Sequence, residues 1–198
     1  ERPGANENDE FIPVTAHGVK LLSMGLLINE SDPVAVRGPL ATRYVQQFLR
    51  NVAWGDVDFL ILDLPPGTGD IQLTIVQTAE LDGVVVVTTP QEVALIDARK
   101  AIGLFERVET PILGIIENMS YFQCPSDGKI YHIFGEGGGE REAAKLGVPL
   151  LGKIPLDIST RFGGDEGRPV ALEDPGQNPV SAAFRQVAEQ CARVVLDR

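Results

Sequence analysis

The sequence predicts a three-layer α/β domain with a mainly parallel β-sheet. Apolar runs of strand length alternate along the chain with amphipathic helical patterns, which is typical of a parallel sheet with helices on its faces. The runs are almost continuously hydrophobic, as strands covered on both faces require. With 198 residues and 43% hydrophobic content, we expect a single domain over residues 1–198, with a flexible segment at residues 1–10.

Five apolar runs bounded by turn residues are the predicted strands. In chain order they are Val19–Leu22, Phe59–Leu64, Val84–Thr89, Ile112–Glu117 and Pro149–Ile154. Apolar residues at helical spacing predict helices between and after them. These helices are Leu40–Trp54, Glu92–Val108, Gly139–Leu146 and a final helix from Val180 to Val195. Two stretches rich in Gly, Pro and charge, Glu1–Asp9 and Gly163–Asn178, are predicted to be loops.

Charge and cysteine content restrict the partners and the compartment. The chain has 28 acidic and 17 basic residues and a net charge of −11, which repels nucleic-acid phosphates and anionic lipid, so we expect neither nucleic acid nor membrane as a partner. The two cysteines, Cys124 and Cys191, show no disulfide spacing. Neither a membrane span nor a secretory signal is recognisable, and we expect a cytoplasmic protein.

A carboxylate followed by a glycine-rich loop is the strongest chemical pattern. Asp63 begins the run Asp-Leu-Pro-Pro-Gly-Thr-Gly-Asp directly after a predicted buried strand, where ligands bind in open α/β sheets. Asp63 therefore resembles a Walker B aspartate that holds Mg²⁺. Glycines in the loop let backbone N–H groups approach a phosphate closely. The alternative is an ordinary turn from strand to helix, capped by Asp70.

Several further runs, in order, carry a family resemblance. They are DLPPGTGDIQ at 63–72, TTPQ at 88–91 and ENMSYF at 117–122, together with RGP at 37–39, QQFL at 46–49, IFG at 133–135 and GKIPL at 152–156. From about Ile12 to Pro175 the chain resembles the Mrp/ApbC branch of the MinD-like P-loop ATPases. The fold that this implies is the P-loop NTPase fold.

The resemblance implies a function and a set of site residues. The function is ATP-dependent binding of an iron–sulfur cluster, of the [4Fe-4S] type, and its transfer to recipient apoproteins by a homodimer or a paralogue heterodimer. Asp63 would be the catalytic, magnesium-binding residue. The nucleotide-binding residues would be Asp63, Pro66, Gly67, Thr68, Gly69, Asn118 and Pro155. Asn118 would read the adenine edge, since an amide both donates and accepts; the alternative is an Asn that caps a strand end.

The chain departs from the family pattern in its phosphate loop. No run with Gly-Lys-Ser/Thr occurs, and the tract Gly135–Gly139 lacks a following Lys-Ser/Thr, so we interpret that tract as a turn and the start of a helix. We expect the chain to begin after the family's first strand and phosphate loop. Without those N–H groups and lysines, this chain alone is not expected to hydrolyse ATP.

The second departure concerns the cluster ligands. The family's Cys-x-x-Cys reads here as Cys124-Pro-Ser-Asp127, so Asp127 stands where the second cysteine belongs. A carboxylate is a poorer match for sulfide-bridged iron than a thiolate, and such a site should be labile. One alternative is that Cys124 is a loop cysteine with no ligand role. Another is that His132 contributes a nitrogen ligand, although a lone histidine is more often a structural or exposed residue. Cys191 lies in an apolar helical stripe and is interpreted as structural.

Two other functions fit the same pattern. One is a nucleotide-dependent adaptor that binds proteins without carrying a cluster, because the second cysteine is missing. The other is a MinD/ParA-type positioning ATPase, which predicts a basic patch or an amphipathic membrane helix; the mixed charges of the final helix argue against the latter.

Overall fold

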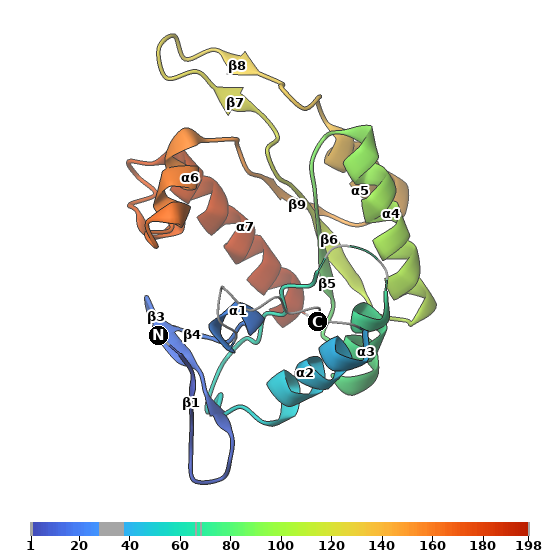
Figure 1. Cartoon of the computed structure of the whole chain (residues 1–198). Coiled ribbons are helices and arrows are strands. Elements are labelled where there is room, and N and C mark those ends of the chain that lie inside the picture. Colours follow the sequence, from blue (N-terminus) through green and yellow to red (C-terminus); the bar gives the residue numbers. More distant parts are fainter. Residues whose placement is uncertain (1, 28–37, 66, 68, 198) are drawn as a thin grey trace. The chain divides into compact units, whose positions relative to one another are not determined.

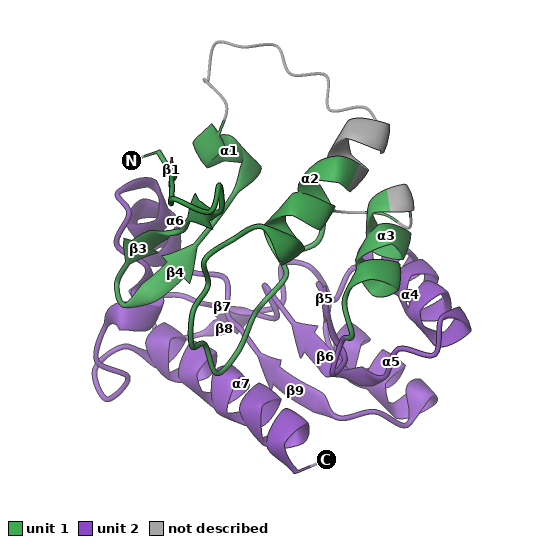
Figure 2. Cartoon of the chain, turned by 90° about the horizontal axis from the view of Figure 1, so that it is seen from below, with its two compact units in different colours: residues 1–80 green, residues 81–198 purple. Residues whose placement is uncertain are grey.

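The computed structural model describes residues 2–27, 38–65, 67 and 69–197. Two compact units are present, residues 1–80 and residues 81–198 (Figure 2). Each unit is described by itself below. The expectation of one domain over the whole chain stays a prediction.

A three-stranded parallel sheet is the centre of the second unit (Figure 1). Its strands are β5 (Val84–Thr88), β6 (Ile112–Glu117) and β9 (Leu150–Lys153), in the order β5-β6-β9. In β6, Ile115 is fully buried and Ile116 is 8% exposed. Successive side chains of a strand point to opposite faces, so both faces of the central strand are covered.

Helices cover the two faces of this sheet, as Figure 1 shows. On one face, α4 (Glu92–Arg107) and α5 (Gly138–Leu146) pack on Ile115 through Ile102 and Ala143. On the other face, α7 (Pro179–Leu196) packs Val187 against Ile116. The predicted three-layer α/β class, with a parallel sheet between helices, is therefore confirmed.

Local sequence signals explain where these helices begin and end. Asn178 caps α7, since its side-chain oxygen accepts from the backbone N–H groups of Val180 and Ser181, and Pro179 occupies the first turn, where no N–H partner is needed. Gly147 ends α5 in the left-handed conformation, with φ of 67°. Cys191 on α7 packs beside the apolar cluster of this face, and burial raises the pKa of its thiol, which agrees with a structural role.

The remaining elements of the second unit follow the sheet's strands. A short antiparallel hairpin, β7 (Phe122–Gln123) and β8 (Ile130–Tyr131), lies between β6 and α5. After β9 come α6 (Ile158–Asp165) and a short 3-10 helix, η1 (Val170–Leu172). The prediction that Gly163–Asn178 is entirely loop was therefore partly wrong, because α6 and η1 occupy part of it; Asp157 caps α6 by accepting from Thr160 N.

The described residues of the first unit form two small hairpins and three helices. Strand β1 (Gly4–Ala5) pairs with β2 (Phe11–Ile12), and β3 (Val14–Ala16) pairs with β4 (Val19–Leu21), both antiparallel. The helices are α1 (Met24–Leu27), α2 (Gly38–Arg50) and α3 (Asp70–Thr78).

In this unit, the structure differs from the prediction at two of the predicted strands. The run Val19–Leu22 was predicted for the parallel sheet, but β4 forms one arm of a hairpin, because His17 and Gly18 turn with positive φ and fold it back on β3. The predicted strand Phe59–Leu64 is not a strand, and no ladder is recorded for it among the described residues. Ile61 is 87% exposed. A strand needs a neighbour that takes up its N–H and C=O groups, so hydrophobicity alone was an insufficient signal.

An ion pair joins α4 to α5. The Nε and Nη2 atoms of Arg99 donate to the two carboxylate oxygens of Glu142 at 2.9 and 2.6 Å, and Lys145 Nζ donates to Oε1 at 2.8 Å. Because the Glu142 side chain is only 6% exposed, these contacts are weakly screened by water. The hydrogen bond from Arg99, followed by that from Lys145, lowers the pKa of Glu142 from 4.5 to about 2.

Acid is expected to weaken the fold through Glu142. A carboxylate with a lowered folded-state pKa contributes fully above its unfolded value of 4.5, and this contribution is lost as pH falls towards 2. Urea unfolding of the wild type and Glu142→Gln should therefore differ clearly near neutral pH and converge as the pH falls. Asp97→Asn is the control, because the Asp97 side chain is 77% exposed beside Lys100. This variant should change the free energy of unfolding little, both near neutral pH and at low pH. A pH-independent difference for Glu142→Gln would contradict this reading.

Candidate functional site

The carboxyl ends of the three parallel strands meet at one edge of the sheet. β5 is followed by Thr89 and Pro90, β6 by Asn118, and β9 by Ile154 and Pro155. The backbone N–H of Asn118 donates to the carbonyl of Thr88 at 2.7 Å, which extends the pairing of β5 and β6 past the last strand residues. This edge is where open α/β sheets bind ligands.

Asn118 lies in a tight turn at this edge. Its side-chain oxygen accepts from the N–H of Met119 at 2.9 Å, and Met119 adopts a left-handed φ of 52°. An amide oxygen has two lone pairs, so this bond leaves the oxygen a second acceptor position as well as the NH₂ donors. Asn118 is half-buried, and its predicted adenine contact stays a prediction.

Pro155 directly follows the end of β9. The backbone around it is engaged on both sides: the N–H of Ile154 donates to the carbonyl of Glu117 at 2.9 Å, and the N–H of Leu156 donates to the carbonyl of Tyr121 at 2.8 Å. Pro155 itself is buried. Its predicted nucleotide contact is untested.

The predicted magnesium and phosphate residues belong to the first unit. Asp63, Gly67 and Gly69 are all exposed, whereas Pro66 and Thr68 lie outside the described residues. Gly67 has a φ of 102°, and a Cβ there would meet nothing within 4 Å. Gly69 is the N-cap residue of α3, which differs from the alternative in which Asp70 would cap the helix.

A glutamine that the sequence did not single out anchors this loop. Gln72 is 3% exposed, and its Nε2 donates to the carbonyl of Pro65 at 2.8 Å. A buried amide on α3 thus holds the first proline of the loop. Its position inside the quoted run DLPPGTGDIQ was the available signal.

Cys124 begins the tip of the β7–β8 hairpin. The tip is closed by two backbone hydrogen bonds, from Cys124 N to the carbonyl of Lys129 at 2.9 Å and from Gly128 N to the carbonyl of Cys124 at 2.8 Å. Gly128 adopts a φ of 70°, which a glycine does without strain. The turn therefore places residues 124 and 127 on the same short loop.

The two predicted cluster ligands are both biased towards their charged forms. Cys124 Sγ lies 3.1 Å from Ser126 Oγ, and this hydrogen bond is the main cause that lowers the pKa of the Cys124 thiol. Asp127 Oδ1 accepts from the N–H of Lys129 at 3.0 Å, and this bond is the main cause that lowers the pKa of Asp127. A thiolate is the form of cysteine that binds metal.

The hairpin provides two candidate ligands from one chain. Within the described ranges, no group of three or more His, Cys, Asp or Glu side chains is placed to hold a metal ion. His132 lies instead beside Glu136, with 3.6 Å between Nε2 and Oε1. Four ligands usually hold an iron–sulfur cluster, so one copy of Cys124 and Asp127 is half a set.

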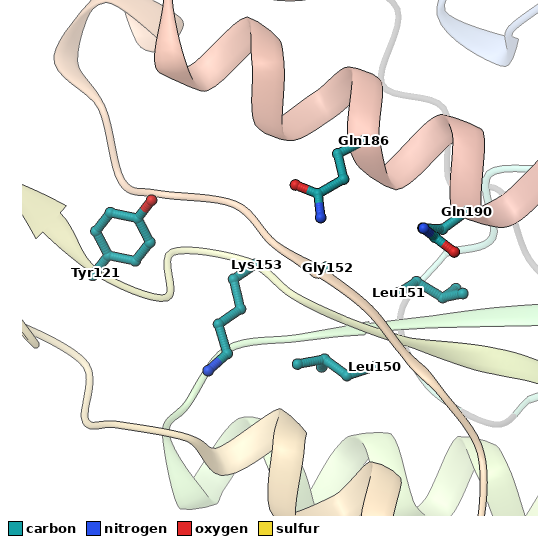
Figure 3. Close-up of a pocket in the computed structure, with 7 residues that line it drawn as sticks. All are labelled: Tyr121, Leu150, Leu151, Gly152, Lys153, Gln186 and Gln190. Carbon is teal, nitrogen blue, oxygen red and sulfur yellow. The ribbon is translucent and has the colours of Figure 1, made fainter.

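A separate cavity of about 560 Å³ lies between β9 and α7 (Figure 3). Tyr121, Gln186 and Gln190 line it, together with the β9 residues Leu150, Leu151, Gly152 and Lys153. None of the predicted site residues lines this cavity, so the candidate site is the strand edge and the hairpin.

Comparison with known proteins identifies the family. The family described as "ParA: NUBPL iron-transfer P-loop NTPase" matches residues 1–192. The chain belongs to this family. The predicted resemblance to P-loop ATPases of the iron–sulfur cluster carrier type is thereby confirmed.

Curated relatives of this NUBPL-type chain carry iron–sulfur names. The chain is 45% identical over 193 residues to "Iron-sulfur protein required for NADH dehydrogenase, mitochondrial" of Arabidopsis thaliana, covering 98% of the chain and 61% of that protein. It is 48% identical over 193 residues to an iron–sulfur cluster carrier protein of Deinococcus radiodurans, covering 96% of the chain and 54% of that protein. The chain thus spans little more than half of the length of these relatives.

Solved structures agree on the NTPase fold. A nucleotide-binding protein from Archaeoglobus fulgidus, solved in complex with ADP, is 37% identical with a TM-score of 0.71, over 84% of this chain and 65% of that one. The cell division ATPase MinD of Pyrococcus furiosus is 24% identical with a TM-score of 0.56, over 77% of this chain and 59% of that one, and supports the fold alone. None of the described helices is long and apolar enough to cross a membrane.

Proposed function

We propose that this chain belongs to an ATP-dependent carrier that holds an iron–sulfur cluster at Cys124 and transfers it to recipient apoproteins. The observation that carries the proposal is a cysteine at the tip of a hairpin, with its thiol pKa lowered by Ser126, in a chain of the NUBPL iron-transfer family. A lowered pKa increases the thiolate available for iron. An exposed tip lets a recipient reach the cluster.

The ligand count favours two copies around one cluster. Each chain offers the thiolate of Cys124 and the carboxylate of Asp127. A homodimer, or a dimer with a paralogue, would therefore supply four ligands, which is the number that a [4Fe-4S] cluster takes. The carboxylates are the harder and weaker pair. A labile cluster suits a protein that gives its cluster away.

The nucleotide side of the proposal rests on Asp63 and the loop after it. Mg²⁺ is usually held by one or two carboxylates together with substrate phosphates, and the exposed Asp63 provides one such carboxylate. The magnesium ion would neutralise phosphate charge during ATP hydrolysis. Gly67 and Gly69, with Pro66 and Thr68, would supply loop backbone towards the phosphates, and Asn118 would bind the adenine. Hydrolysis itself is proposed for a protein that carries the phosphate loop, and not for these 198 residues alone.

Anaerobic reconstitution with iron and sulfide tests the proposal. The wild-type protein, as its gene encodes it, should take up iron and sulfide and gain a broad visible absorption band. Cys124→Ala should lose nearly all of it, because the only thiolate of the hairpin is removed. Cys191→Ala is the matched control and should reconstitute like the wild type, since Cys191 packs in the sheet's apolar layer. Equal iron and sulfide content in wild type and Cys124→Ala would contradict cluster binding at the hairpin.

A nucleotide-dependent adaptor without a cluster is the second candidate. Asp127 in place of a cysteine favours it, because one thiolate per chain is a minimal ligand set. ATP binding with no uptake of iron or sulfide would support this adaptor. A reducing cytoplasm is the compartment that we propose for either function, since both cysteines are free thiols.

A further inference from the structure

A buried carboxyl group ends the central strand of the sheet. Glu117 is the last residue of β6 and is fully buried. Its Oε1 accepts from Ser120 Oγ at 2.5 Å, and its Oε2 accepts from the backbone N–H of Gly139 at 2.6 Å. None of the ion pairs between described residues involves Glu117. Burying a carboxyl group without hydrogen-bond partners is costly. Moving either donor away from Glu117 is therefore unfavourable.

The two donors stand on either side of the hairpin segment. Ser120 directly precedes residues 121–138 and Gly139 directly follows them. This segment contains β7, β8 and Cys124, and Figure 1 shows the hairpin extending beyond the end of the sheet. The two oxygens of one carboxyl group therefore fasten both ends of the segment that carries the candidate cluster ligand.

Two glycines make the second attachment possible. A Cβ on Gly139 would lie 3.1 Å from the Cβ of Glu117, and a Cβ on Gly138 would lie 2.6 Å from the carbonyl oxygen of Pro90. The first turn of α5 thus sits directly on the ends of β6 and β5. A larger side chain at either position would push the helix, and the hairpin before it, away from the strand ends.

Glu117 also adjoins the turn that holds Asn118. The chain runs from Glu117 through Asn118 and Met119 to Ser120, and the bond from Ser120 back to Glu117 closes this turn. The N–H of Ser120 donates to the carbonyl of Ile154 at 3.0 Å, which ties the turn to the end of β9. A shift of Asn118 therefore moves one of the two donors on which the hairpin depends.

We propose that Glu117 is a positioning residue that couples the Asn118 turn to the Cys124 hairpin. Through its two oxygens, a change at the nucleotide edge alters the hold on both ends of residues 121–138. The nucleotide arm of this inference rests on the proposed function, whereas the mechanical link between turn and hairpin is independent of any ligand. A merely structural acid would lower overall stability without a selective effect on the hairpin.

The link is tested first without nucleotide, in a Cys191→Ala background where Cys124 is the only thiol of these 198 residues. Glu117→Ala should raise amide hydrogen exchange across residues 121–138, and change the alkylation rate of Cys124, by about tenfold, because both attachments are lost. Glu117→Gln should restore wild-type values, since its amide oxygen accepts from Gly139 N while its nitrogen donates to Ser120 Oγ.

Leu113→Ala is the control for general destabilisation. Leu113 is a 5% exposed residue of the same strand that takes no part in the attachment. It should lower the melting temperature and leave the ratio of hairpin exchange to sheet exchange unchanged. If Glu117→Ala behaved like Leu113→Ala, with a lower melting temperature and no selective change in residues 121–138, the inference would be overturned.

The nucleotide arm uses the protein as its gene encodes it, with MgATP. ATP should change the alkylation rate of Cys124 in the wild type and in Glu117→Gln, and the change should disappear in Glu117→Ala. Retention of the full ATP effect in Glu117→Ala overturns the coupling. Absence of any ATP effect in the wild type, alongside the selective exchange change in the ligand-free protein, contradicts the proposed nucleotide response and supports the mechanical link.

Discussion

Replacing Asp127 by cysteine is expected to slow the loss of a reconstituted iron–sulfur cluster by about tenfold to a hundredfold, the scale on which the surroundings of a metal site change its affinity. The thiolate is the softer ligand and matches sulfide-bridged iron better than a carboxylate. The hairpin already holds residue 127 on the same short loop as Cys124. A cysteine there loses the acceptor of the Lys129 N–H, but the two backbone hydrogen bonds that close the tip do not involve the side chain of residue 127.

Cluster loss is followed by the decay of visible absorption after transfer to a chelator. Asp127→Asn is the matched control, because it keeps the size of the side chain and removes its charge, and its cluster should decay faster than that of the wild type. Asp127→Cys combined with Cys124→Ala should be no better than the wild type, since one thiolate has only replaced another. Equal decay for the wild type and Asp127→Cys would show that residue 127 is not a ligand.

Replacing Gly114 by alanine is expected to lower the free energy of unfolding by about 3 kcal/mol, at the upper end of the usual cost of overpacking a core. A Cβ at this position of β6 would lie 2.6 Å from Cγ of Leu151 and 2.7 Å from the carbonyl oxygen of Pro149. Gly114 also adopts a φ of 155°, which L side chains rarely adopt. The central strand and β9 would have to separate, which disturbs both apolar layers.

Gly103→Ala is the control for this substitution. Gly103 lies within α4, and a Cβ there would meet nothing within 4 Å. Alanine in the interior of a helix is favoured over glycine by about 0.5–1 kcal/mol, so this variant should be slightly more stable. Chemical unfolding measures both changes. A Gly114→Ala protein as stable as the wild type would mean that β6 and β9 are less tightly packed than the structure shows.

The sheet of the second unit could be predicted from the sequence because its strands are apolar on both faces. Ile112–Glu117 was predicted with its observed bounds, and Val84–Thr89 and Pro149–Ile154 differ from β5 and β9 by at most a residue at either end. The same signal failed at Phe59–Leu64. An apolar run indicates that a segment is favoured in the core. A strand also requires a neighbouring strand that pairs with its N–H and C=O groups, and the run itself does not indicate whether that neighbour is present.

The candidate site was only partly accessible to sequence reasoning. Cys124 and Asn118 could be predicted because each lies in or beside a short contiguous run that resembles the family's sequence. The contact of Glu117 with Gly139 joins residues 22 positions apart, and the close approach of Gly138 to Pro90 joins residues almost 50 apart. Such contacts depend on the packing of α5 against two strand ends. A charged residue that closes an otherwise apolar strand was the one available hint.

The exposed apolar segment Phe59–Ile61, which follows α2, has a consequence for handling the protein in the laboratory. Phe59, Leu60 and Ile61 are 48%, 44% and 87% exposed, and no ladder is recorded for them among the described residues. Exposed apolar segments that are not paired in a sheet can pair with the same segment of other chains and so promote aggregation. Self-association of this 198-residue chain at high concentration would therefore begin at this run, and a single lysine in place of Ile61 would be the economical way to keep it dispersed.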